Sequence, residues 1–345
     1  MLIAPDAEKR SSRQSYEKLA ARSVCRMRNG SRWPALLVGA AVITLSAGVP
    51  PSATALSAAA PSAAGPREHS CPILPASNPL NQEISHAPVD PNSASYIASI
   101  GASTHLHADF GTNPSYGIPY AVVGAGQPKV PVDFTEFGEE SNPGPYPIPP
   151  NAPVEGAGEA GDRHVLVLQT GACRLYELYS ARRHGAGWEA GSGAVFNLRS
   201  NALRPEGWTS ADAAGLPIFP LLVRYPEVRA GQIDHALRVT VERTQRGYIH
   251  PATHFASTSA DPSLPPMGLR LRLKSSFSLA GYHGQALVVL RALKRFGLIV
   301  ADNGSSWYVT GAPDARWSDE DLNQLKTVPG SAFEAVKTGP ILHRG

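Results

Sequence analysis

Alternating polar side chains in residues 104–110 form the pattern best suited to chemistry. His105, His107 and Asp109 are spaced two apart, and on an extended strand such residues share one face. Two imidazoles and a carboxylate that point the same way could serve an acid/base site or hold a metal ion. We therefore name His107 and Asp109 as candidate catalytic residues and assign no metal ligand. An inert polar loop is the alternative.

The most apolar stretch of the chain, residues 162–179, holds two further candidates. Two apolar runs flank a short loop at 170–172, which predicts a β-hairpin with Gln169 opposite Cys173. Both faces of this hairpin are largely apolar. It therefore belongs in the middle of a sandwich or under a layer of helices.

His164 and Glu177 are the polar residues within this apolar hairpin, and we name both as candidate catalytic residues. If they are buried, each needs a hydrogen-bonding partner. One interpretation is a structural pair. The other is an acid or base whose pKa is shifted by burial.

Aromatic and imidazole side chains could bind a substrate. Tyr248, His250 and His254 lie close together in an irregular stretch, where Pro251 excludes a helical pair of metal-binding histidines. We name Tyr248, His254 and Trp208 as candidate substrate-binding residues, because such side chains line pockets and stack on sugar rings. The alternatives are amphipathic surface for the loop and core packing for the tryptophan.

The elements that must position these residues are mainly short strands. Alternating or continuous apolar runs predict strands at 96–100, 120–123, 193–198, 236–242 and 269–274. In the last of these, outward Arg270, Arg272 and Lys274 would form a basic stripe. A second hairpin is predicted over 298–310.

Helices are few. Gln285 to Phe296 carries an apolar stripe and ends before Gly297, which is typical of an amphipathic helix with a glycine C-cap. Capping boxes predict short helices that begin at Thr209 and at Ser318. Residues 142–153 have Pro at six of twelve positions and should form an extended strap, which could also border a cleft.

This order of elements, in a chain with 32 Gly and 32 Pro, predicts a β-rich α+β fold. We expect an antiparallel sandwich or a barrel-like sheet with short peripheral helices. The predicted globular domain covers residues 71–335, preceded by a disordered linker at 56–70 and followed by a tail at 336–345.

The first 55 residues resemble an export signal. A basic segment that begins at Met27 precedes an apolar run from Pro34 to Val49, and Ala53-Thr-Ala55 matches a cleavage site before Leu56. We expect a secreted or cell-envelope protein that begins at Met27. A single uncleaved membrane anchor is the alternative, and this segment would be the chain's only contact with a membrane.

Removal of this segment changes the charge. Residues 1–55 carry 8 of the 31 basic and 3 of the 28 acidic residues, so the remainder has 23 basic and 25 acidic groups and a net charge of −2. This balance gives no reason to expect nucleic-acid binding. Of the three cysteines, Cys71 and Cys173 remain and are expected to form a disulfide in an oxidising compartment.

Sequence motifs exclude several enzyme classes without naming one. The chain has no GxSxG elbow, no P-loop, no HExxH and no dinucleotide-binding glycine motif after a strand. No cofactor is indicated.

The runs 200–218, 161–164, 233–238 and 301–307 resemble those of an uncharacterised group of exported bacterial proteins. The resemblance implies export but carries no activity and no catalytic residue.

Export, a charge near zero and a surplus of Tyr, Trp, His and carboxylates favour a protein that acts on extracellular carbohydrate. We expect a glycoside hydrolase or a polysaccharide lyase. The alternative is a non-catalytic carbohydrate-binding or cell-envelope protein, which needs aromatic platforms but no acid/base pair.

Overall fold

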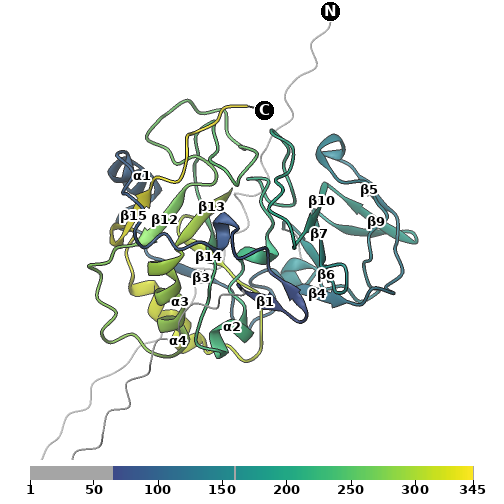
Figure 1. Ribbon diagram of the computed structural model, residues 1–345. Helices are drawn as coiled ribbons and strands as arrows, with labels where there is room; N and C mark the ends of the chain where they lie inside the picture. The colour runs from purple at the N-terminus through teal and green to yellow at the C-terminus, as the bar shows by residue number, and fades with distance from the viewer. Residues whose placement is uncertain (1–64, 159–160, 345) are drawn as a thin grey trace, which may run out of the picture. The chain divides into compact units, whose positions relative to one another are not determined.

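The computed structural model describes residues 65–158 and 161–344 (Figure 1). The predicted signal with its start at Met27, the cleavage site before Leu56 and most of the predicted linker lie outside these residues. Within the described part, the chain is rich in strands and contains few short helices, which confirms the β-rich α+β class.

The larger sheet has six strands in the order β15-β12-β13-β11-β14-β3. Its members are β3 (His107–Asp109), β11 (Leu237–Val241), β12 (Arg270–Leu273), β13 (Leu298–Asn303), β14 (Tyr308–Thr310) and β15 (Phe333–Val336). The pairs β11/β13 and β14/β3 are parallel and the others antiparallel. The sheet is therefore mixed, where a wholly antiparallel arrangement was predicted.

The second sheet has four strands in the order β10-β7-β6-β4. Its members are β4 (Tyr120–Val123), β6 (Val165–Gln169), β7 (Arg174–Tyr179) and β10 (Ser192–Asn197). A three-stranded sheet contains β5 (Val132–Phe134), β9 (Gly187–Ala190) and β8 (Arg182–His184), and β1 (Arg67–Glu68) pairs with β2 (Cys71–Pro72). The strands of each sheet leave two open edges, so the barrel-like alternative is excluded for the described chain.

Strands β6 and β7 form the predicted hairpin, which lies between two hydrophobic cores. Leu166 and Leu168 of β6 belong to the main core, whereas Val165 and Val167 belong to a second core that includes Trp188. Alternating side chains therefore pack on opposite faces of the same strand. This confirms that the hairpin is covered on both sides.

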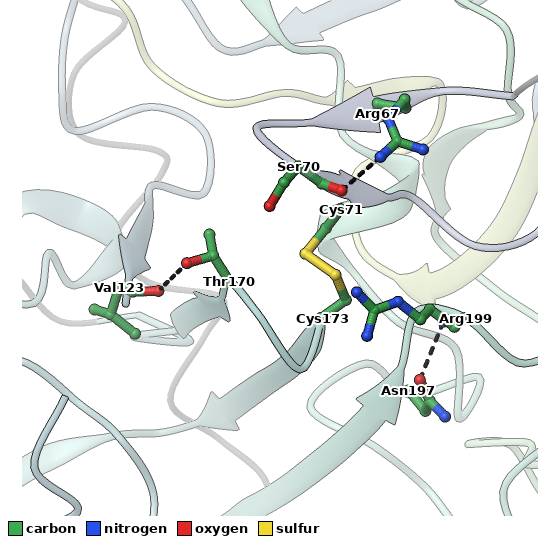
Figure 2. The surroundings of a disulfide bond; sticks show 8 residues. All are labelled: Arg67, Ser70, Cys71, Val123, Thr170, Cys173, Asn197 and Arg199. Carbon is green, nitrogen blue, oxygen red and sulfur yellow. Dashed lines mark hydrogen bonds between the residues drawn. A yellow bond between two sulfur atoms is a disulfide. The ribbon is translucent and has the colours of Figure 1, made fainter. Parts of the chain in front are cut away.

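The register of the hairpin differs from the predicted one by one residue. Gln169 pairs with Arg174 and Leu166 pairs with Glu177, because the loop has four residues, 170–173. Cys173 leaves the strand with a φ of 50°. It forms the predicted disulfide with Cys71 (Figure 2), which ties β2 to the hairpin.

In the described residues the α-helices are α1 (Ser93–Ile100), α2 (Tyr225–Arg229), α3 (Gly284–Arg295) and α4 (Asp319–Asn323). Helix α3 confirms the predicted amphipathic helix, and its apolar stripe packs against β12. Helix α4 begins after Ser318, whose hydroxyl accepts the N–H of Asp321 as the capping motif predicts.

Two predictions about helices and strands were wrong. Residues 96–100 form the end of α1 and not a strand: buried Ser93, Tyr96, Ile97 and Ile100 follow the helical spacing that a five-residue window could not reveal. No helix follows Thr209, because its hydroxyl bonds to the carbonyl of Asp212 and the Asp212 carboxylate binds elsewhere.

The predicted second hairpin and basic stripe were also wrong. Strand β11 lies between β13 and β14, so these two strands are sequence neighbours without being paired. On β12, Arg270 and Arg272 are only 2% and 9% exposed. Their guanidinium groups donate to backbone carbonyls, and Arg272 also pairs with Glu334. A basic side chain with that many acceptors is stable inside the protein.

The ends of the predicted domain require adjustment. Strand β1 begins at Arg67, inside the segment predicted to be a disordered linker. Strand β15 ends at Val336, and Leu342 forms a bridge with Tyr248. Residues of the predicted tail therefore pack against the domain.

Candidate functional site

Strand β3 places His107 and Asp109 at the edge of the six-stranded sheet, opposite Tyr308 and Thr310 of β14. Because both residues lie on one strand and are spaced two apart, they share a face as predicted. The His107 ring stacks on Tyr308 with 4.2 Å between centroids. Both candidates are half-buried, so they are neither sealed in the core nor fully solvated.

The environment shifts both side chains toward their neutral forms. Burial lowers the pKa of His107, helped by the charge of Lys326. Burial also raises the pKa of Asp109, and the charge of Glu155 raises it further against the opposing charge of Arg238. Glu155 is therefore one of the groups whose charge acts on Asp109.

Glu155 is held by His164, a candidate residue that precedes β6. The His164 Nδ1 lies 2.6 Å from the Glu155 carboxylate, and its Nε2 lies 2.9 Å from the carbonyl oxygen of Ala211. Both ring nitrogens therefore face acceptors, so both donate. Burial alone would lower the pKa of His164, but the charge and hydrogen bond of Glu155 outweigh it and raise that pKa to about 9.

The same pairing keeps Glu155 ionised. Burial alone would raise the pKa of Glu155, but the charge and hydrogen bonds of His164 lower it. Its side chain retains 22% of its exposure, whereas that of His164 retains 2%. The imidazolium is thus a buried support, and the carboxylate is the group that solvent can reach.

The charge of a buried arginine, Arg238, acts on both carboxyls in the direction that lowers their pKa values. Arg238 of β11 donates twice to Asp212, at 3.0 and 2.9 Å, and once each to Asp302 and Thr310, both at 2.9 Å. Burial raises the pKa of Asp302 to about 7; the charge of Asp212 adds to this increase, while Arg238 opposes it. Asp212 lies in the capping box predicted at Thr209, and Asp302 lies in the hairpin predicted over 298–310. Neither local pattern reveals that Arg238 is the partner of both carboxylates.

Unlike Asp109 and Glu155, Glu177 is fully buried, which corrects its assignment as a catalytic residue. It has no exposed surface, and its carboxylate accepts the N–H groups of Ile218 at 3.0 Å and Phe219 at 2.8 Å. These bonds satisfy the start of the 3-10 turn Phe219–Leu221. Burial raises the pKa of Glu177 to about 7 although both backbone bonds oppose the shift. Its role is structural.

The three candidate substrate-binding residues gather elsewhere. Tyr248 and His254 both lie against Phe255, and the ring of Trp208 lies 5.6 Å from the guanidinium of Arg204. Among the described residues, none of their hydrogen bonds or ring contacts reaches Asp109 or Glu155. These contacts therefore do not join the candidate substrate-binding residues to the two carboxyls.

Tyr248 takes part in a cluster that the sequence analysis missed. Its hydroxyl donates to one oxygen of Glu206, and the other oxygen of Glu206 lies 2.7 Å from Nε2 of His250. Burial raises the pKa of Tyr248 to about 12, and its bond to Glu206 adds to the shift. The 42-residue separation of Glu206 and Tyr248 explains why no local pattern revealed the pair.

A hollow of about 220 Å³ lies at the β10 edge of the four-stranded sheet. Asn142 of the Pro-rich strap lines it, as expected if the strap borders a cleft. None of the seven candidate residues lines this hollow, so it is separate from the Asp109 and Glu155 carboxyls.

Neither a metal centre nor a transmembrane helix is found in the part of the chain that the structure describes. There, no three His, Cys, Asp or Glu side chains gather as a metal site, and no helix has the length and apolar character to cross a membrane. Comparisons with family models, curated proteins and solved structures give no match.

Proposed function

We propose that the protein is an exported glycoside hydrolase in which Asp109 and Glu155 form the carboxyl pair. Two half-buried carboxyls support this proposal: Glu155 is held by His164 at 2.6 Å, and Asp109 lies on edge strand β3. Burial raises the pKa of Asp109, whereas the charge and hydrogen bonds of His164 outweigh burial and lower the pKa of Glu155. A neutral acid beside an ionised carboxylate is what glycosidic bond cleavage requires.

Each residue has a distinct task in this mechanism. Asp109, whose pKa is raised by burial, donates its proton to the glycosidic oxygen as the bond to the anomeric carbon breaks. Glu155 either accepts a proton from the water that attacks the anomeric carbon, or attacks that carbon itself to form a glycosyl ester. Water then cleaves this ester as the Asp109 carboxylate takes up a proton from it. His164 is a positioning residue, because its ring fixes Glu155 at 2.6 Å and its other nitrogen is anchored to Ala211.

Hydrolysis uses a proton donor and an ionised carboxylate, which the proposed pair supplies, whereas a lyase would use its base to remove a proton from a sugar carbon. The two reactions differ in their products: a hydrolase releases only new reducing ends, whereas a lyase also creates an unsaturated sugar. Incubation of the purified protein with a panel of polysaccharides, followed by both readouts, distinguishes them. Reducing ends without unsaturated products support the proposal.

Variants test the residues. Asp109→Asn and Glu155→Gln should each lower turnover by about 10² to 10⁴. Asp109→Asn should leave the melting temperature nearly unchanged because its side chain is partly exposed, whereas Glu155→Gln also removes the charged partner of buried His164 and should lower the melting temperature. Asp133→Asn, which alters an exposed carboxylate of β5, is the matched control and should retain activity. Full activity of Asp109→Asn on a cleaved polysaccharide would rule out this pair.

A non-catalytic carbohydrate-binding protein is the second candidate function. The hollow beside β10 favours it, because this hollow lies apart from the carboxyl pair and is lined by polar groups. Saturable binding of a polysaccharide without release of reducing ends would support this alternative.

A further inference from the structure

The hollow at the β10 edge has a lining without acidic residues. It is bounded by β10, the start of β7, the strap and the segment that follows β10. The lining residues are Asn142, Arg174, Val195, Phe196, Asn197, Ser200, Ala202, Leu203, Arg204 and Pro205. Its only ionised side chains are two arginines, so the hollow favours an anionic ligand.

The amide and hydroxyl oxygens of this lining accept hydrogen bonds from other groups of the protein. The Asn142 Oδ1 accepts from the Val195 N–H at 2.9 Å and from Arg204 at 2.7 Å. The Asn197 Oδ1 accepts from the N–H of Arg199 at 3.1 Å, a bond that Figure 2 shows. The Ser200 hydroxyl likewise accepts a backbone N–H. These bonds fix the amide orientations, so what remains for a ligand is a set of donors.

The two arginines differ in their availability. Arg204 is buried, and its guanidinium donates to Thr209, Asn142 and Glu140. Arg174 is exposed at the start of β7, and within the described ranges its side chain has no hydrogen bond or ion pair. Arg174 therefore supplies the cation that a ligand can bind, while Arg204 is a fixed part of the wall.

The remaining wall is apolar. Phe196 is half-buried, and Leu203 keeps 45% of its surface exposed at the rim. A ligand that covers such a wall gains from the removal of apolar surface from water. The hollow is also smaller than the roughly 300 Å³ at which pockets for drug-sized molecules begin. Its occupant should therefore have one ring and one apolar face.

We propose that this hollow binds a single acidic sugar residue, a hexuronate. Its carboxylate pairs with Arg174, whose planar guanidinium matches a carboxylate in two hydrogen bonds. Its ring and hydroxyl oxygens accept from Asn142, Asn197 and Ser200. The C–H face of the ring covers Phe196 and Leu203. The site needs no catalysis, so it is independent of the proposed hydrolase activity.

Calorimetric titration of the purified protein tests this site without any turnover. The ligands are the methyl glycosides of glucuronate, galacturonate and glucose. Saturable binding of at least one uronide, about tenfold tighter than that of the glucoside, is expected because the charged hydrogen bonds are lost with the carboxylate. Equal affinity for the glucoside, or no binding of either uronide, would overturn the proposal.

Variants locate the binding. Arg174→Ala should weaken uronide binding about tenfold, and Arg174→Lys should restore part of it because the charge returns without the planar fork. Arg199→Ala is the matched control, since Arg199 is exposed nearby but does not line the hollow. An Arg199→Ala loss equal to that of Arg174→Ala would mark nonspecific charge attraction and reject the site.

Competition by inorganic sulfate and phosphate distinguishes a sugar-binding site from a general oxyanion-binding site. If the ring contributes, each anion should compete with the uronide only weakly, and Leu203→Ala should reduce uronide affinity. Competition by sulfate at equal affinity, with no effect of Leu203→Ala, would reject the sugar assignment. Failure here leaves the Asp109 variants unaffected, so the two proposals can be judged separately.

Discussion

The charge state of individual side chains depends on partners that the fold brings together. His164 and Glu155 form a buried ion pair, whereas Asp109 is pushed toward its neutral form by burial and by Glu155. Burial alone would raise the pKa of both carboxyls, but the charge and hydrogen bonds of His164 reverse the shift for Glu155, so the two pKa values move apart. This separation leads to two expectations about pH.

The first concerns activity. Glu155 must be ionised, so turnover should fall as the pH drops through its lowered pKa. Asp109 must be protonated, so turnover should fall as the pH rises through its raised pKa. A bell-shaped profile of kcat/KM against pH is expected on any cleaved polysaccharide. Loss of the alkaline limb in Asp109→Asn would support the assignment; an unchanged alkaline limb would contradict it.

The second concerns stability. The folded-state pKa of His164 is raised from 6.5 to about 9, so its contribution is complete below pH 6.5 and is lost as the pH rises through about 9. Urea unfolding should show this decrease, up to about 3 kcal/mol.

His164→Gln should lower stability below pH 6.5 and flatten the curve above it. His184→Gln, at an exposed position of β8, is the control and should leave the curve unchanged. A His164→Gln curve parallel to that of the unmodified protein would contradict the ion pair.

A buried arginine that the sequence pattern predicted on the surface connects several elements of the fold. Arg272 of β12 donates to the carbonyls of Ile84, Ser85 and Ala87 at 2.6 to 3.0 Å and pairs with Glu334 of β15. It therefore links β12 to its neighbour and to the segment after the N-terminal strands. The same strand ends beside Lys274, which is partly exposed.

These two cations provide a matched comparison. Arg272→Ala should lower the free energy of unfolding by about 3 to 5 kcal/mol, because it leaves a carboxylate and three carbonyls without their donor. Lys274→Ala should change it by less than about 0.5 kcal/mol. Equal, small losses in urea unfolding would show that Arg272 is not a buried support.

The disulfide joins elements that are distant in the chain. Cys71 and Cys173 are 102 residues apart, so the bond restricts a long loop in the unfolded chain. Replacement of both by Ser should lower stability by up to about 4 to 5 kcal/mol in the chain-entropy model. Chemical unfolding with and without reductant measures this difference. The reductant should have no effect on the double variant.

At the scale of the whole molecule, the remaining expectation concerns export and processing. The basic, apolar and small-residue order before Leu56 predicts cleavage there. N-terminal sequencing of protein recovered from the medium or envelope of an expressing bacterium should begin at Leu56 or within a few residues. Recovery in the membrane fraction with residues before Met27 retained would favour the anchor alternative.

The sequence by itself determined features that depend on neighbouring residues. The period of α3, the cap of α4, strands β4, β10, β11 and β12, and the two-sided apolar hairpin are all visible in short windows. The disulfide followed from cysteine counting. The shared face of His107 and Asp109 also followed, because residues two apart on a strand point to the same side.

Only the tertiary structure decided which polar groups meet. Glu155 and His164 belong to different segments of the loop before β6, Arg238 and Asp212 are 26 residues apart, and β11 separates the strands of an apparent hairpin. Glu177 pairs with Leu166, one residue from the predicted register, and accepts the N–H groups of Ile218 and Phe219. The pairing of strands that are distant in the chain leaves no periodic pattern in the sequence. The same is true of the carbonyl and carboxylate acceptors that surround a buried arginine. Local pattern therefore indicated the elements, whereas long-range packing chose the partners of their charged side chains.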